Sequence, residues 1–350
     1  MTLLIFLRRF VYIGYYFKKL DWQKFHYFTN HYAIGNQKSK LSIWYGMLAD
    51  SIKFNISLLE YFMFDFAHKT KEEKASWSGT GYMYEYQLKM NPPEYRSVLS
   101  DKTQFLVQYR DFVKHEFITL SALEGNPGKG EQLLNNPSGK LVLKNSKGQC
   151  GRGIEVVDSK AFTPVSLVER LKATGNDFAE AYVVQHPDLM SLSPAGLNTV
   201  RIITQLDRTN KVHLLGARLR ITVNSPIDNL AAGNIAAPID IDAGIVTGPG
   251  VYSDITKTDE YHHPVTGVSI PGFQVPFWSE TIELCKAAAL VDTRNRSIGW
   301  DVAITETGPE LIEGNHDWCK LLWQLPVKRG LKDRLEAFLI EFQHSTINHP

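Results

Sequence analysis

Two carboxylates and an amide near the carboxyl end of the chain have the spacing of metal ligands. The stretch GWDVAITETGPELIEGN, residues 299–315, alternates apolar and polar residues before a turn-forming Thr-Glu-Thr-Gly-Pro, which predicts a β-hairpin. A turn centred near Thr307 sets Asp301 opposite Glu313. Asn315 returns to the same face because side chains alternate along a strand.

This arrangement predicts a cation site. Like charges directly opposed on a sheet are destabilising, so Asp301 and Glu313 require a cation between them. Carboxylate and amide oxygens are hard ligands, suited to Mg²⁺ or Mn²⁺ that also holds phosphates. The alternative is a solvated edge hairpin whose register is shifted by one residue.

A second hairpin opposes two arginines. The segment LNTVRIITQLDRTNKVHLLGARLRITV reads as two strands around a four-residue loop at 208–211. Pairing across this loop sets Arg201 opposite Arg218, with Arg220 next on the same face. An anion such as phosphate or carboxylate, gripped by the guanidinium groups, would relieve the repulsion. The alternative is a solvated basic face. Together the two hairpins predict a metal–phosphate substrate.

A glycine-rich loop follows the strand that ends at Lys144. Gly148, Gly151 and Gly153 precede the next strand, IEVVD, and successive glycines let backbone N–H groups converge on phosphate oxygens. Ile and Glu follow Gly153 where the Walker pattern needs Lys and Ser or Thr. The dinucleotide-binding pattern fails too, because a strand follows instead of a helix. We interpret the loop as a flap over phosphates, with an ordinary hairpin loop as the alternative.

The elements that position these residues indicate an α+β protein. Residues 1 to about 75 show helical periodicity, and further helices are expected at 99–114, 161–173 and the carboxyl end. Strands are expected on both sides of the glycine-rich loop, at 181–187, and in the two hairpins. With 350 residues, 43% of them apolar, the chain can form two or three structural units.

Charge and cysteine content narrow the class of protein. A net charge of +1 gives no indication of nucleic-acid binding. The three cysteines are far apart and show no metal-ligand spacing, which is typical of a reducing, intracellular compartment.

The amino terminus is aromatic and basic. Arg8 and Arg9 interrupt its apolar run, so nothing approaches the roughly 20 apolar residues that span a bilayer, and the order of residues does not fit a signal peptide. Two interpretations stay open. The segment is either an interfacial helix on an anionic membrane or an amphipathic helix packed on its own domain.

The order of these motifs, from Lys102 in SDKTQF to the final hairpin, resembles the ATP-grasp superfamily. The resemblance is closest to its sugar-transfer-associated branch, related to glutamate-ligase-type enzymes, and covers about residues 95–325. The separation of twelve residues between Asp301 and Glu313 is its most specific element. The resemblance implies an ATP-grasp fold of two lobes whose antiparallel sheets clasp ATP, with a helical region at 1–95, one lobe at 96–184 and the other at 185–350.

The resemblance also implies roles for individual residues. Lys102 and Lys144 would contact the α- and β-phosphates, and the segment from Ser146 to Gly153 would be the mobile flap. Gln185, in the hinge VVQH, would meet the adenine edge. The remaining roles are the phosphoryl-transfer and acceptor site, at Arg201, Arg218 and Asn229, and the metal site, at Asp301, Glu313 and Asn315. The family usually has two glycines where this chain has Gly233 and Asn234.

The activity implied is an ATP-dependent carboxylate–amine ligase that forms an amide through an acyl phosphate, with ATP and Mg²⁺ or Mn²⁺ as cofactors. The family name implies cell-surface polysaccharide biosynthesis, with small carboxylate and amine substrates, one of them a nucleotide- or lipid-linked sugar. We expect a cytoplasmic enzyme, in peripheral contact with the inner face of the membrane. The alternatives are a phosphotransferase on the same fold and a degenerate, nucleotide-binding regulatory protein.

Overall fold

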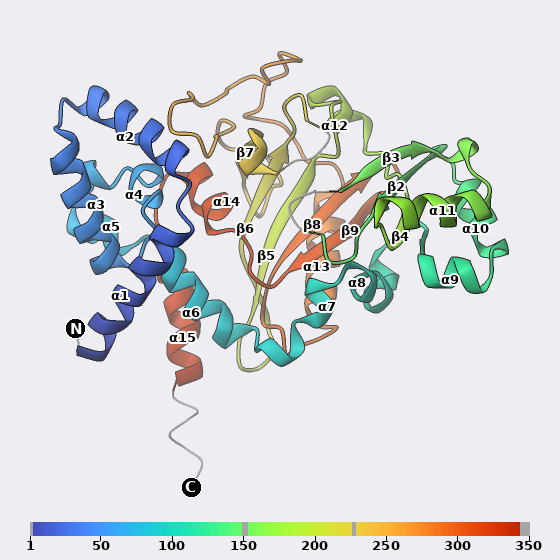
Figure 1. Ribbon diagram of the computed structural model, residues 1–350, viewed down its shortest axis with the longest axis horizontal. Coiled ribbons are helices and arrows are strands. Elements are labelled where there is room, and N and C mark those ends of the chain that lie inside the picture. The colour runs from blue at the N-terminus through green and yellow to red at the C-terminus, as the bar shows by residue number, and fades with distance from the viewer. Residues whose placement is uncertain (1–2, 149–152, 226–228, 344–350) are drawn as a thin grey trace, which may run out of the picture.

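The computed structural model describes residues 3–148, 153–225 and 229–343. These residues form helices and two antiparallel sheets, which confirms the predicted α+β class. In Figure 1 the amino-terminal helices lie at one end, the five-stranded sheet in the middle and the four-stranded sheet at the other end.

The amino-terminal region is helical, as predicted. Asp21 caps the second helix by accepting the Lys24 N–H at 2.9 Å, and buried aromatic rings such as Phe25, Phe28 and Phe62 form its core. None of the described helices is both long and apolar enough to cross a membrane. The helices are α1 (Leu3–Lys18), α2 (Trp22–Asn36), α3 (Lys40–Phe54), α4 (Glu60–Met63), α5 (Lys71–Ala75) and α6 (Thr80–Met90).

The four-stranded sheet has the order β1-β4-β2-β3. Helices α9 (Leu120–Gly125), α10 (Gly128–Leu134) and α11 (Pro164–Thr174) contribute to the apolar core beside it. Two short helices, α7 (Ser97–Ser100) and α8 (Lys102–Gln108), precede it. Its strands are β1 (Phe117–Thr119), β2 (Lys140–Lys144), β3 (Glu155–Asp158) and β4 (Phe178–Ala181).

The strand expected at 181–187 was placed too late in the chain. β4 ends at Ala181, and the His186 N–H donates to the Ile304 carbonyl at 2.7 Å. Because Ile304 belongs to the other sheet, the chain has already crossed between the sheets by residue 186.

The five-stranded sheet has the order β7-β6-β5-β8-β9 and carries the largest apolar core. Both hairpins predicted from the sequence are adjacent pairs in it. Its strands are β5 (Thr199–Leu206), β6 (Val212–Ile221), β7 (Ile235–Ile239), β8 (Ser297–Thr305) and β9 (Gly308–Asn315). The helices of this part of the chain are α12 (Pro187–Leu192), α13 (Trp278–Ala289), α14 (Lys320–Gln324) and α15 (Asp333–Gln343).

A β-bulge sets the register of the last hairpin. Near the turn, Thr305 pairs with Gly308, so the turn is centred half a residue before Thr307. The register then shifts between Val302 and Asp301, and the extra residue Ile312 restores the pairing of Asp301 with Glu313. The predicted pair is confirmed, although simple counting from the turn does not produce it.

The arginine hairpin behaves in the same way. Its loop comprises five residues, 207–211, instead of the four expected. A register shift beside Thr204 leaves Leu215 as the extra residue, and Arg201 then pairs with Arg218 as predicted.

The four strands of the first sheet lie within 96–184 and those of the second within 185–350. The domain boundaries at 95 and 184 stay a prediction.

Candidate functional site

A row of charged side chains crosses the five-stranded sheet. Arg218 of β6 is paired with Arg201 of β5, and Arg201 is paired on its other side with Asp301 of β8. Asp301 in turn is paired with Glu313 of β9. Paired residues in neighbouring strands project from the same face. The two hairpins therefore lie edge to edge, and the basic pair meets the acidic pair at Arg201 and Asp301.

Asp301 is held by two arginines. Arg201 donates from Nε to Oδ1 at 2.5 Å and from Nη2 to Oδ2 at 2.9 Å, and Arg220 donates from Nη1 to Oδ2 at 2.6 Å. Burial alone would raise the pKa of Asp301, but the two guanidinium groups hold it well below its usual range. The cation beside Asp301 in this structure is thus an arginine side chain.

Glu313 is in the opposite electrostatic situation. Burial raises its pKa, and the charge of the neighbouring Asp301 raises it further. Asn315 donates from Nδ2 to Glu313 Oε1 at 3.1 Å. Both effects oppose a negative charge on Glu313, which a bound cation would compensate.

The ligand types around Glu313 fit a hard divalent cation. Glu313 and Asn315 offer a carboxylate and an amide oxygen at a cavity wall, and Asp301 offers oxygens that it shares with the arginines. In the described part of the chain no three His, Cys, Asp or Glu side chains are grouped so as to hold a metal. A cation bound here would therefore need further oxygens from phosphates or waters, as Mg²⁺ commonly does.

A cavity of about 540 Å³ separates the two sheets at this point. Its volume is in the range of about 300–1,000 Å³ that small-molecule sites occupy. The structure brings together side chains that are more than 200 residues apart in the sequence. Of the predicted site residues, those that line the cavity are Lys102, Lys144, Gly148, Arg201, Asn229, Asp301, Glu313 and Asn315.

Two lysines form the basic wall opposite the arginines. Asp101 caps α8 by accepting the Thr103 N–H at 3.0 Å, which fixes Lys102 at the first position of the helix. Lys102 Nζ donates to the carbonyl of Gly148, so the lysine contacts the flap. Lys144, at the end of β2, forms an ion pair with Glu180 of β4.

The flap is anchored at its start. Ser146 is buried, and its N–H and hydroxyl both donate to the Asp177 carboxylate at 2.6 Å, so this serine fixes the loop and does not line the cavity. Gly153 has a φ of +74°, in the left-handed region that glycine adopts without strain. Gly151 lies outside the described residues.

Besides Ser146 and Gly153, two further predicted site residues do not line the cavity. Arg218 is buried, and its Nε donates to the carbonyl of Trp323 at 3.0 Å, whereas Arg220, two residues later, lines the cavity. Gln185 is also buried. It donates to the Gly196 carbonyl at 2.8 Å and accepts the Asn198 N–H at 3.0 Å, so both ends of its amide are used inside the protein.

Asn229 lines the cavity at the start of a short turn. Its side chain accepts the Ala231 N–H at 3.0 Å, and Gly233 ends the turn with a left-handed φ of +89°. The following Asn234, which replaces a glycine of the family pattern, donates to the Asn229 carbonyl at 3.0 Å. This asparagine therefore stabilises the loop that presents Asn229.

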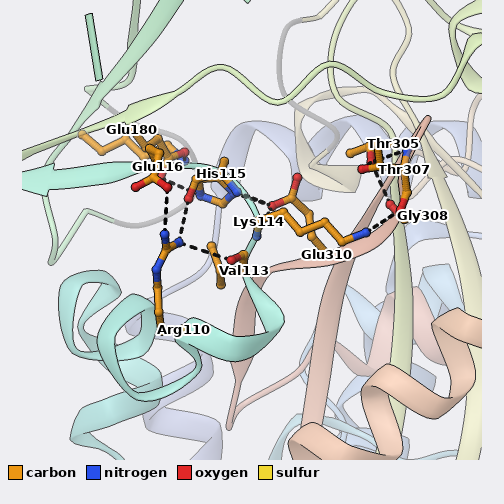
Figure 2. A network of polar contacts seen from close by, with 11 residues as sticks. Arg110, Val113, Lys114, His115, Glu116, Glu180, Thr305, Thr307, Gly308 and Glu310 are labelled. Carbon is orange, nitrogen blue, oxygen red and sulfur yellow. Dashed lines mark hydrogen bonds and ion pairs between the residues drawn. The ribbon is translucent and has the colours of Figure 1, made fainter. Parts of the chain in front are cut away.

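A second buried network ties the cavity wall to the neighbouring sheet. His115 Nδ1 lies 2.7 Å from Glu310 of β9, and His115 Nε2 lies 3.7 Å from Glu180 (Figure 2). Burial favours the neutral ring, but these two carboxylates outweigh it and raise the pKa of His115 to about 9. Burial likewise opposes ionisation of Glu180, yet Lys144 and His115 lower its pKa to about 2. His115 is thus a cation between two carboxylates.

Residues 113–116, which include His115, form hydrogen bonds on both sides of it. Arg110 donates to the His115 carbonyl at 3.1 Å and to Glu116 at 2.9 Å, and Lys114 donates to the Thr307 carbonyl at 2.7 Å (Figure 2). Segment 113–116 therefore joins the loop between β8 and β9 to the four-stranded sheet.

Sequence reasoning missed Glu180, His115 and Glu310, and it did not select Arg220. For Glu180 a signal exists, because a lone acid interrupts the buried strand FAEA. Arg220 shares its strand face with Arg218, and the spacing alone does not show which of the two reaches the cavity. Nothing in the sequence KHEF singles out His115.

The family model of sugar-transfer associated ATP-grasp proteins matches residues 82–339. No curated protein sequence matches the chain.

Several solved structures are similar to parts of the chain. The ATP-grasp ligase PsnB, complexed with a minimal precursor, is 13% identical over 72% of this chain and 63% of its own, with a TM-score of 0.42. The biotin carboxylase domain of 2-oxoglutarate carboxylase from Hydrogenobacter thermophilus, with MgADP, ADP and bicarbonate, is 16% identical over 66% of this chain and 45% of its own, with a TM-score of 0.38. D-alanyl-alanine synthetase A from Vibrio cholerae is 11% identical over 73% of this chain and 67% of its own, with a TM-score of 0.42. The chain thus spans less than two thirds of the first two.

Proposed function

The chain belongs to the sugar-transfer associated ATP-grasp family, as its sequence predicted, and we propose that it is an ATP-dependent carboxylate–amine ligase. ATP-grasp enzymes use ATP and Mg²⁺. The observation that carries the proposal is the cavity between the two sheets, which has lysines on one wall and the Arg201–Asp301–Glu313 row on the other.

The basic wall suits the phosphates of a nucleotide. Lys102 lines the cavity from α8 and donates to the Gly148 carbonyl, and Lys144 lines it from β2 and pairs with Glu180. A phosphate oxygen would replace each of these partners. The contact between Lys102 and the flap carbonyl provides a route for closing the flap over the ligand. Arg201 and Arg220, on the opposite wall, would stabilise the negative charge of the transferring phosphoryl group.

Glu313, Asn315 and Asp301 are the residues that would hold Mg²⁺ or Mn²⁺. When bound here, a divalent cation would neutralise nucleotide phosphates and polarise the phosphoryl group. The electrostatics of the chain support this, because burial and the charge of Asp301 raise the pKa of Glu313, so a negative charge on Glu313 is unfavourable unless a cation compensates it.

The proposed reaction has two steps. The substrate carboxylate attacks the γ-phosphate of ATP, which forms an acyl phosphate and releases ADP. An amine then attacks the acyl carbon and displaces phosphate, which forms an amide. Arg201 and Arg220 would bind the acyl phosphate between the steps, and neither step requires a nucleophilic side chain of the protein.

The family description supports a substrate that carries a sugar. We propose that one of the two substrates is a nucleotide- or lipid-linked sugar of cell-surface polysaccharide synthesis, and that the enzyme works at the cytoplasmic face of the membrane. Asn229, on its ordered turn at the cavity edge, is the polar group proposed for the acceptor.

Calorimetric titration of ATP tests the proposal, with and without Mg²⁺, on the unchanged protein and on Glu313→Ala. We expect binding that requires Mg²⁺ and that weakens at least tenfold in the variant. An intact fold that binds no nucleotide would support a degenerate protein instead. If ATP binds, screening of sugars and amines for ADP release follows. A phosphorylated product without an amide would assign a phosphotransferase.

A further inference from the structure

Helix α1 has apolar side chains on two opposite faces. Its inner face, with Tyr12, Ile13, Tyr16 and Phe17, packs against the aromatic core of the amino-terminal region. That face packs the helix on its own domain.

The outer face carries a second apolar stripe. Leu7 is 56% exposed, Phe10 49%, Val11 71% and Tyr15 53%. Spacings of three and four residues place these side chains along one side of the helix. Exposed apolar residues are common singly, whereas a contiguous stripe of four is typical of an interaction surface.

The charged side chains of α1 itself are all basic. α1 contains no acidic residue, and Arg8, Lys18 and Lys19 flank the stripe as exposed side chains. Glu85 of α6 is the acidic group that reaches it, through an exposed contact of 3.5 Å with Arg8.

The same asymmetry extends beyond the helix. Residues 1–49 contain seven Lys or Arg and one acid, Asp21, for a net charge of +6, whereas the remaining 31 basic and 36 acidic residues give the rest of the chain −5. The positive charge of this protein is therefore concentrated in the region that lies outside the family match at 82–339.

We propose that the outer face of α1 docks on an anionic lipid bilayer. Leu7, Phe10, Val11 and Tyr15 enter the boundary between headgroups and acyl chains, where aromatic residues are favoured. Lys18 and Lys19 lie beside the lipid phosphates. The helix rests parallel to the surface.

Charge complementarity selects lipid over a second copy of the chain. A symmetric contact between two α1 outer faces would bring Arg8, Lys18 and Lys19 against their equivalents, with like charges opposed. An anionic bilayer instead supplies a continuous negative surface and an apolar layer beneath it, which matches both properties of the face.

This inference extends the proposed function. Only its link to a lipid-linked sugar substrate rests on that function. A ligase held on a membrane would meet a lipid-linked sugar at its own surface. The docking itself is independent of nucleotide binding, so the two can fail separately.

Sedimentation of the full chain with vesicles tests the docking. The vesicles are phosphatidylcholine alone, or phosphatidylcholine with about one third phosphatidylserine, at low and at physiological salt. Two variants disturb the face: Leu7→Ser with Val11→Ser, and Lys18→Glu with Lys19→Glu. The matched controls alter equally exposed residues elsewhere: Val107→Ser with Val165→Ser, at 67% and 61% exposed, and Lys129→Glu with Lys160→Glu.

We expect binding to the anionic vesicles that weakens with salt and is at least tenfold weaker on phosphatidylcholine alone. Each basic residue near an anionic surface contributes about a five-fold factor in partitioning, so the double lysine variant should lose about 25-fold or more. Both control variants should bind as the unchanged chain does, and all variants should bind MgATP equally.

Three results would overturn the proposal. The first is no sedimentation with anionic vesicles at low salt. The second is an equal loss of vesicle binding in the variants of the α1 outer face and in the control variants. The third is dimerisation in solution that the Leu7→Ser, Val11→Ser change abolishes, which would assign the stripe to a second copy. Because MgATP binding is measured on the same samples, a failure of docking is distinct from a failure of the ligase proposal.

Discussion

Glu310 and Glu313 lie three residues apart on one strand, and their electrostatic environments are opposite. Burial opposes ionisation of both. Beside Glu310 is the cationic His115, and the pKa of Glu310 is lowered. Beside Glu313 is the anionic Asp301, and the pKa of Glu313 is raised. One strand thus carries a carboxylate whose charge is compensated by the protein and another whose charge is left for a ligand to compensate.

The difference distinguishes structural charges from binding charges. The pair of His115 and Glu310 lies away from the cavity lining and is internally compensated, with His115 only 8% exposed. The Asp301 cluster borders a cavity and places two carboxyl groups side by side, which is unfavourable when Glu313 is ionised as well as Asp301 and no cation compensates Glu313. The raised pKa of Glu313, caused partly by Asp301, is therefore the electrostatic feature that supports the proposed metal site.

The largest loss of stability is expected for Asp301→Ala. This change removes the carboxylate that pairs with Arg201 and Arg220, and breaking a buried ion pair from one side lowers the free energy of unfolding by about 3–5 kcal/mol. Urea denaturation measures it. Asp301→Asn, which keeps the volume, should lose nearly as much because the charge is missing. A loss below 1 kcal/mol in both would show that the arginines do not depend on Asp301.

The second prediction concerns how the stability of the protein depends on pH through His115. The pKa of His115 is raised from 6.5 to about 9, so its contribution to stability is complete below about pH 6.5 and is lost as pH rises through 9. The shift corresponds to at most about 3 kcal/mol. Denaturation curves between pH 6 and 10 should show this decline, and His115→Gln should flatten it. An unchanged slope in the variant would assign the pH dependence to other groups.

The third prediction contrasts the two glutamates directly. Glu310→Gln leaves His115 with one carboxylate fewer and should lower the free energy of unfolding by about 1–3 kcal/mol, without altering Mg²⁺-dependent nucleotide binding. Glu313→Gln removes a negative charge that burial and Asp301 oppose, so stability should change by less than about 0.5 kcal/mol. The same variant should lose Mg²⁺-dependent nucleotide binding. The reverse pattern would overturn the distinction between the two sites.

The smallest effect expected is on metal affinity. Because the pKa of Glu313 is raised, a cation competes with a proton, so Mg²⁺-dependent nucleotide affinity should increase with pH by up to about tenfold per unit until the proton is lost. Calorimetry at several pH values, against Glu313→Gln as the reference for titration of the nucleotide itself, measures it. Identical pH profiles for both proteins would exclude Glu313 as the titrating ligand.

The sequence predicts which residues of this site pair across the strands better than it predicts which side chains reach the cavity. Alternation and turn residues are local, and they identify both hairpins and the pairs Arg201–Arg218 and Asp301–Glu313. Whether Arg218 or Arg220 faces the cavity depends on α14, since the Trp323 carbonyl at its end accepts from Arg218. Such contacts join residues about a hundred positions apart and leave no local pattern.

Gln185 and His115 also show that residue type alone does not reveal which side chains reach the cavity. Gln185 has the character expected of a ligand contact, yet its amide is used by Gly196 and Asn198, which follow within thirteen residues. The arrangement of His115 with Glu180 and Glu310 is assembled from three elements of the chain, β4, β9 and the segment before β1. Its parts are visible in the sequence only as separate charges.

The bulge at Ile312 has a genetic consequence. Residues three apart normally face opposite sides of a strand, and the extra residue is what turns Glu310 and Glu313 to the same side, opposite Ala303 and Asp301. Loss of the single codon for Ile312 would leave Glu310 and Glu313 two residues apart, so regular alternation would keep both on the same side, with Glu313 still opposite Asp301. Such an in-frame deletion would remove the bulge and retain the proposed ligands, so the pairing of this strand would survive the loss of a residue that contributes no ligand.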